Sequence, residues 1–115
     1  MTALIVFSTF PDESAARAAA GKLVEERLAA CVNILPSLTS LYRWKGKIET
    51  SEEVLLIIKT TRESYPRLES ALKACYPYEL PEILAVAVDA GLPEYLQWVA
   101  HETARTNKNS NERLP

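Results

Sequence analysis

A thiol, two phenols and two carboxylates lie within the eight residues CYPYELPE, at positions 75–82. Thiolates bind copper and zinc well, and carboxylate oxygens suit harder divalent cations. Ligands also bind preferentially on loops that a rigid scaffold positions. A structural interpretation competes with a metal site: Cys75 falls on the apolar face of a helix and packs in the core, while Tyr76 and Tyr78 fill a subunit contact. These residues alone favour the structural interpretation.

Catalytic groups are sparse. His101 is the only histidine, and helical spacing places it on a polar face with Glu94 and Gln97, where we expect it to be solvated. A histidine so placed offers no base to a serine or cysteine nucleophile. The turn at positions 8–11 contains neither the glycine nor the arginine of an acylphosphatase-like phosphate cradle. The sequence therefore predicts no catalytic residues.

Charge and composition argue against several function classes. The 115 residues carry a net charge of −2, which provides no basic surface for nucleic acid. No window approaches the ~18 apolar residues of a membrane span, and the N-terminus lacks the basic region of a signal peptide. Two cysteines, Cys31 and Cys75, are too few for a disulfide scaffold. A reducing cytoplasm is therefore the expected location.

Hydrophobic spacing predicts the elements that position these residues. Strands are expected at 2–10 and 80–89, and helices at 14–30 behind an Asp12 cap, from about Ser64 to Pro77, and from Pro93 onward. Residues 31–60 form a hairpin that reverses at Lys45-Gly46. This order predicts an α+β, ferredoxin-like βαββαβ fold with a C-terminal helix. The first and third strands lie in mid-sheet, and the first two helices cover one face. Residues 1–105 make one domain, and 106–115 a polar tail.

The hairpin is too long for its domain. Its first arm, 31–44, extends roughly 45 Å at about 3.3 Å per residue, whereas a domain of this size is roughly 35 Å across. Pro36 cannot donate to a strand ladder, so we expect a bulge or bend there. The second arm changes from polar to apolar at Val54. We expect a buried near half and a far half that reaches another copy of the chain, because exposed strand edges find partners.

Five segments match, in order and spacing, the successive motifs of one family: LVEERLAACVNILP, SLYRWKGKIE, LLIIKT, YPYELPEI and GLPEYLQW. By these motifs the chain resembles the CutA family of divalent-cation tolerance proteins from about Leu4 to Trp98. The resemblance implies a PII-like homotrimer in which hairpins wrap their neighbours. It also implies a response to divalent metals, above all copper, without enzymatic activity.

The resemblance further implies where a metal would bind. Metal-binding members can carry a cysteine at the end of the first strand and a histidine before the Pro-Tyr pair. Here these positions are Ser8, Cys75 and Tyr76. Copper prefers thiolate, thioether or imidazole, so Cys75 is the one good ligand of the three. Glu79 and Glu82 add oxygen donors. No cofactor is required, and copper or another divalent metal is the candidate ligand.

We expect the trimer interface to include Cys31, Pro36, Tyr42, Trp44 and Tyr78, with Tyr42 and Trp44 as aromatic anchors near the hairpin tip. Nucleic acid and membranes are not expected partners.

Two alternatives remain open. One is a PII-like sensor that binds a small anionic metabolite between subunits through Lys59, Arg43 and Lys45, although no glycine-rich phosphate loop is present. The other is an oligomeric scaffold whose function lies in its protein partners.

Overall fold

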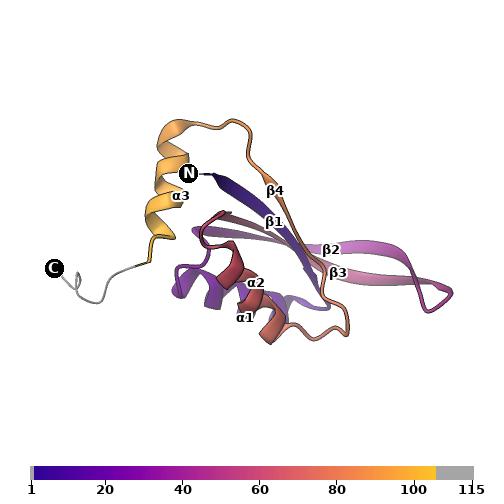
Figure 1. Ribbon diagram of the computed structural model, residues 1–115. Coiled ribbons are helices and arrows are strands. Elements are labelled where there is room, and N and C mark those ends of the chain that lie inside the picture. The colour runs from indigo at the N-terminus through magenta and orange to yellow at the C-terminus, as the bar shows by residue number, and fades with distance from the viewer. Residues whose placement is uncertain (1, 106–115) are drawn as a thin grey trace.

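The computed structural model describes residues 2–105 and shows an α+β architecture (Figure 1). The elements, in chain order, are β1 Ala3–Phe10, α1 Glu13–Glu25, β2 Cys31–Trp44, β3 Lys47–Thr61, α2 Tyr65–Cys75, β4 Ile83–Ala87 and α3 Pro93–Glu102. The strands form one antiparallel sheet in the order β2-β3-β1-β4. This order confirms the predicted ferredoxin-like arrangement, with the first and third strands in the middle. The predicted tail, 106–115, lies outside the described residues.

Helix α1 is shorter than predicted. It begins as expected, because the Asp12 carboxylate accepts a hydrogen bond from the amide of Ala15 at 2.8 Å. It ends at Glu25 rather than near residue 30, because Arg27 adopts a left-handed conformation with φ of 59°. The amides of Arg27 and Leu28 then bond to the carbonyls of Val24 and Leu23, which is a Schellman cap. Helical spacing alone did not reveal this stop, since arginine is an uncommon residue at a left-handed cap.

Strand β4 is also shorter than the predicted range of 80–89. The amide of Glu82 donates to the hydroxyl of Tyr76 at 3.1 Å, so it bonds to the preceding loop rather than to a neighbouring strand. The ladder with β1 starts at the pair of Ile83 and Ser8. Leu80 is 68% exposed and belongs to the loop.

The hydrophobic core lies between one face of the sheet and the helices α1 and α2, which lie together below the sheet in Figure 1. Its fully buried side chains come from two strands and two helices. They are Val6 and Phe10 of β1, Leu56 and Ile58 of β3, Ala16 and Leu23 of α1, and Leu68 and Leu72 of α2. Side chains alternate between sheet faces along a strand, so one residue in two of β1 and β3 enters this core.

The opposite side of the sheet is apolar but largely uncovered. We call it the open sheet face, and it comprises Ile5, Phe7, Leu35, Leu55, Ile57, Leu84 and Val86, which neighbour one another across the strands. Leu35, Leu84 and Val86 are 41%, 51% and 47% exposed. Helix α3 stands at the end of the sheet away from the hairpin tip, where Val99 is buried (Figure 1). Within residues 2–105, no helix is long and apolar enough to cross a membrane.

The long hairpin overhangs the rest of the domain, as predicted. The molecule measures 54 × 29 × 21 Å, and Figure 1 shows the ends of β2 and β3 projecting from it. Pairing with β1 stops where Phe10 meets Val54, so residues 47–53 of β3 pair with β2 alone. Pro36 and Ser37 oppose one residue of β3 in a bulge between Leu35 and Leu38, and Ser37 has φ of 64°. This confirms that the hairpin divides at Pro36 and Val54 into a half within the sheet and a half that projects. The contact of the projecting half with another copy stays a prediction.

Candidate functional site

The α2–β4 loop, residues 76–82, and the far half of the hairpin form an open groove with a volume of about 600 Å³. We call it the loop groove. Its lining consists of Thr9, Ser40, Leu41, Tyr42, Arg43, Trp44, Glu53, Tyr78, Glu79, Leu80 and Glu82. Three carboxylates, two phenols and an indole therefore face one space. The segment that first drew attention in the sequence is one wall of this groove.

Tyr76 connects the loop to the core. Its ring stacks on Phe10, with the ring centroids 4.8 Å apart. Its hydroxyl donates to the carbonyl of Thr9 and accepts the hydrogen bond from the amide of Glu82. Because the hydroxyl is already committed to backbone groups, Tyr76 holds the loop in place and is a poor metal ligand.

Tyr78 and Glu53 form a part-buried polar contact in the groove. The hydroxyl of Tyr78 donates to Oε2 of Glu53 at 2.6 Å, and Glu53 is only 8% exposed. Burial raises the pKa of Tyr78 far above its ordinary value, and the hydrogen bond and negative charge of Glu53 raise it further. Sequence reasoning missed Glu53. Its position in the sequence could have indicated that it is buried, because Glu53 directly precedes the apolar run from Val54 that enters the core.

The two other carboxylates of the groove, Glu79 and Glu82, are exposed and differ in their partners. Glu82 accepts a hydrogen bond from the hydroxyl of Thr9 at 3.2 Å. Glu79 lies 3.7 Å from the ammonium group of Lys45 at the hairpin tip, and both side chains are about 70% exposed. An exposed ion pair of this kind adds little stability. Both carboxylates remain accessible to a cation.

Cys75 is exposed, so the expectation that it packs in the core is wrong. It is the last residue of α2, whose buried residues are Leu68 and Leu72. Tyr76, the next residue, covers the core in its place by stacking on Phe10. The spacing of Leu68, Leu72 and Cys75 suggested one continuous apolar face, but the helix ends where that face would continue. An exposed thiol is available to a soft metal ion.

Ser8 does not join this group. It lies on the same face of β1 as Val6 and Phe10, the face that α1 and α2 cover, and it is fully buried. Its hydroxyl has no hydrogen-bond partner among the described residues. Thr9, on the opposite face, reaches Glu82 instead. Of the five predicted metal ligands, the structure leaves Cys75, Glu79 and Glu82 accessible.

These three donors do not form a closed metal site. No group of three or more histidine, cysteine, aspartate or glutamate side chains within residues 2–105 is close enough to hold one ion. Structural sites for copper or zinc need several nitrogen or sulfur ligands held together. The described part of one chain therefore supplies at most part of a coordination sphere.

The predicted interface residues are spread along the hairpin and the loop. Pro36 and Tyr42 are exposed, whereas Cys31, Trp44 and Tyr78 are half-buried. The hydroxyls of Tyr42 and Ser51 lie 3.1 Å apart across the hairpin. The ammonium group of Lys45 lies 5.7 Å from the centre of the Trp44 ring, a cation–π contact at the tip.

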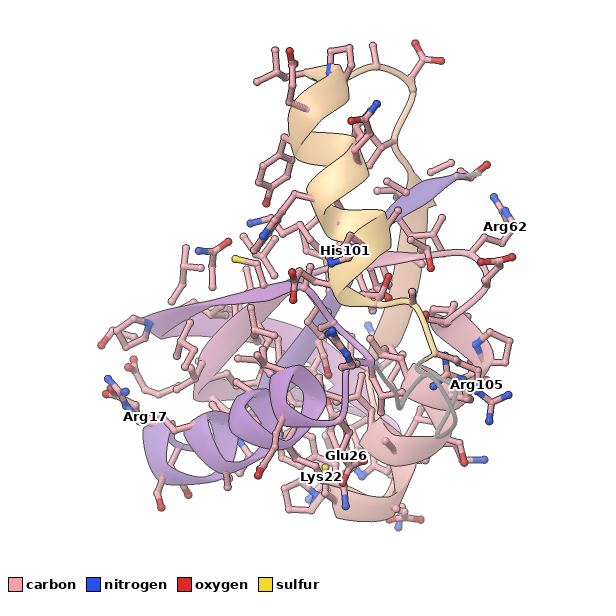
Figure 2. All side chains as sticks on the ribbon, turned by 90° about the vertical axis from the view of Figure 1, so that its left-hand side faces the viewer. Arg17, Lys22, Glu26, Arg62, His101 and Arg105 are labelled. Carbon is pink, nitrogen blue, oxygen red and sulfur yellow. The ribbon has the colours of Figure 1, made fainter. Side chains whose placement is uncertain are left out.

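The candidate anion contacts of the sensor hypothesis do not converge in one chain. Lys59 pairs with Cys31 at one end of β2, and its ammonium group donates to the side-chain oxygen of Asn33. Arg43 and Lys45 lie at the other end of the hairpin. His101 is exposed on α3, as predicted (Figure 2).

Comparison with known proteins matches residues 4–102 to the family described as CutA1 divalent ion tolerance protein. The divalent-cation tolerance protein CutA of Thermus thermophilus is 50% identical over 99 residues, which cover 86% of this chain and 96% of that protein. The human protein CutA is 47% identical over 97 residues. These cover 84% of this chain but 54% of the human protein, so the chain spans about half the length of that relative.

Solved structures agree with the sequence relationship. The Thermus thermophilus divalent cation tolerance protein superposes with a TM-score of 0.87 at 48% identity, covering 89% of this chain and 99% of the other. Rice CutA1 gives a TM-score of 0.88 at 38% identity, covering 92% and 97%. A third, from Archaeoglobus fulgidus, is described as a periplasmic divalent cation tolerance protein, with a TM-score of 0.86, 35% identity, and coverage of 89% and 99%. The chain belongs to the CutA1 family of divalent ion tolerance proteins.

Proposed function

We propose that the protein acts in divalent-cation tolerance as a homotrimer, without catalysing a reaction. Membership of the family supports the role in tolerance, and the open sheet face supports the assembly. A contiguous apolar surface of this kind on a folded domain marks an interaction site, because water penalises its exposure. The projecting hairpin supplies unpaired strand edge and aromatic side chains beside it, which a neighbouring copy can cover.

The proposed assembly is tested by placing a charge on the open sheet face. Val86→Glu puts a carboxylate at a position that is 47% exposed in the single chain and buried in the proposed trimer. Val24→Glu is a matched control, because Val24 is 44% exposed but lies on α1, on the other side of the sheet. Val86→Glu should dissociate the trimer and Val24→Glu should not. Equal masses in solution for the two variants would contradict this interface.

Copper is the proposed metal, and Cys75, at the end of α2, is its proposed ligand. Support comes from the exposure of the thiol and from its place in the sequence, four and seven residues before the exposed carboxylates of Glu79 and Glu82. Since one chain holds no complete set of ligands within the described residues, the remaining positions would be filled by water or by a second copy. Harder divalent ions would use Glu79 and Glu82.

A titration with copper(I) tests this assignment. Cys75→Ser should weaken binding strongly, whereas Cys31→Ser, at the half-buried cysteine on β2, should leave it unchanged. Equal affinities in wild type and Cys75→Ser would remove Cys75 as a ligand. A trimer that binds no metal would instead favour the scaffold alternative.

The cytoplasm remains the proposed location. An exposed thiol at Cys75 and a second free cysteine at Cys31 suit a reducing compartment. Alkylation of both thiols in protein taken rapidly from cells would support it, and oxidised cysteines in the native protein would contradict it.

A further inference from the structure

A small cavity with a volume of about 150 Å³ lies where α1 ends, α2 begins and α3 has just ended. We call it the arginine cavity, and its lining consists of Glu26, Arg27, Arg67, Ala104 and Arg105. Figure 2 looks at this end of the molecule, and Glu26 and Arg105 lie in its lower half. Three segments that are distant in the sequence each contribute one guanidinium group. The lining therefore contains three positive charges and one negative charge, and Glu102, outside the lining, pairs with Arg27.

Arg27 is fixed by the end of α1. The Schellman cap holds its backbone in the left-handed conformation, with φ of 59°. Its Nη1 atom lies 3.4 Å from the carbonyl oxygen of Glu102 and 3.5 Å from its carboxylate. These are long contacts and involve one of the three guanidinium nitrogens. The other two nitrogens make no contact with a carboxylate in the described part of the chain.

Arg67 is half-buried, and its only side-chain hydrogen bond within residues 2–105 is a long one, 3.4 Å to the hydroxyl of Ser64. Across the same described range, neither Arg67 nor Arg105 has a carboxylate within 4.0 Å. Glu26, the acidic group of the lining, lies 3.6 Å from Lys22. Within residues 2–105, Arg27 therefore has a carboxylate partner in Glu102, whereas Arg67 and Arg105 have none.

The helix dipoles explain part of this arrangement but not all of it. Arg27 and Arg105 follow the C-termini of α1 and α3, where a positive charge is favourable. Arg67 lies in the first turn of α2, where a positive charge is unfavourable and an anion is favourable. That turn contains no acidic residue, and Ser64 makes no side-chain cap. A bound anion accounts for the position of Arg67, whereas intramolecular charge pairing does not.

We propose that the arginine cavity binds the phosphoryl group of a small molecule or free inorganic phosphate. Guanidinium groups bind phosphate oxygens through paired hydrogen bonds, which makes arginine well suited to this anion. The cavity is smaller than the ~300 Å³ of typical ligand pockets, so it accommodates one tetrahedral oxyanion rather than a whole nucleotide. It lies on the helical side of the sheet, so the proposed trimer contact on the open sheet face leaves it accessible.

Calorimetric titrations of the full chain with inorganic phosphate, pyrophosphate and ATP test the proposal. Arg67→Gln and Arg105→Gln each remove one guanidinium group from the cavity. Arg17→Gln is the matched control, because it removes the same charge near the other end of α1, where Arg17 is exposed and paired with Glu13 (Figure 2). We expect saturable binding of one anion per chain, weakened about tenfold or more by Arg67→Gln and by Arg105→Gln, and unchanged by Arg17→Gln.

The three ligands distinguish the sources of the anion. Equal affinity for phosphate and ATP points to the free ion, and tighter binding of ATP points to a phosphoryl ester. The proposal is overturned if none of the three gives a saturable signal at millimolar concentration. It is equally overturned if Arg67→Gln and Arg17→Gln bind with the same affinity as wild type. Neither result would affect the proposed trimer, which rests on the other face of the sheet.

Discussion

Tyr78 donates a hydrogen bond from its hydroxyl to the carboxylate of Glu53 at 2.6 Å, and this contact ties the α2–β4 loop to the base of the projecting hairpin. Glu53 is 8% exposed and lies one residue before the point at which β3 begins to pair with β1. The loop and the hairpin are the two walls of the loop groove. The bond between Tyr78 and Glu53 therefore helps to set the shape of the groove.

Tyr78→Phe should destabilise the fold, because the buried carboxylate of Glu53 loses its hydrogen-bond donor. The expected loss is ~1–3 kcal/mol in the free energy of unfolding, measured by urea denaturation. Tyr42→Phe is the control, since the Tyr42 and Ser51 hydroxyls bond in an exposed part of the hairpin. It should cost less than ~0.5 kcal/mol. Equal losses in the two variants would show that Glu53 does not depend on Tyr78.

The raised pKa of Tyr78 predicts a loss of stability at alkaline pH. A group whose pKa is higher in the folded state stabilises the fold fully below its unfolded pKa, about 10 for tyrosine. This contribution is lost as the pH rises from there through the folded pKa. The difference in stability between wild type and Tyr78→Phe should therefore be constant at neutral pH and shrink above about pH 10. A difference that stays constant into alkaline solution would mean that the phenol is not perturbed.

Two glycines should respond in opposite directions to alanine substitution. Gly46 has φ of 82° in the hairpin turn, next to Lys45 with φ of 50°, so Gly46→Ala forces a side chain into a left-handed conformation. We expect a loss of ~1–2 kcal/mol. Gly21 lies within α1, and a Cβ atom there meets nothing within 4 Å. Gly21→Ala should therefore stabilise the protein by up to ~1 kcal/mol, with both variants measured by urea denaturation. Stabilisation by Gly46→Ala would contradict the assigned turn.

The sequence predicted those features that depend on a few neighbouring residues. Asp12 as a helix cap, the reversal at Lys45-Gly46 and the bulge at Pro36 each follow from local backbone chemistry, and the structure confirms all three. The sheet order followed from the pattern of elements and from the handedness of their connections.

Features that depend on distant contacts were not predicted. The exposure of Cys75 depends on Tyr76 stacking on Phe10, far away in the sequence. The end of α1 is local, but it was missed because it is set by a left-handed arginine, a residue that spacing does not mark as a stop. The contact between Glu53 and Tyr78 and the arginine cavity join residues from separate elements. Hydrophobic spacing identifies which face of an element is apolar, but it does not show which polar groups meet once the elements have packed.

The hairpin is the element on which the proposed assembly depends most. Replacing residues 43–47 with a short turn removes the tip with Lys45 but leaves the pairing of β3 with β1 intact. The shortened protein should keep its fold by circular dichroism and should form a weaker trimer. A trimer of unchanged stability would show that the open sheet face holds the assembly together without the tip.

The most direct test of the central claim is the mass of the native wild-type protein at micromolar concentration, measured by native mass spectrometry. We predict three times the 12.8 kDa mass of one chain. A monomer at this concentration would contradict the account, because the open sheet face and the projecting hairpin would then have no partner.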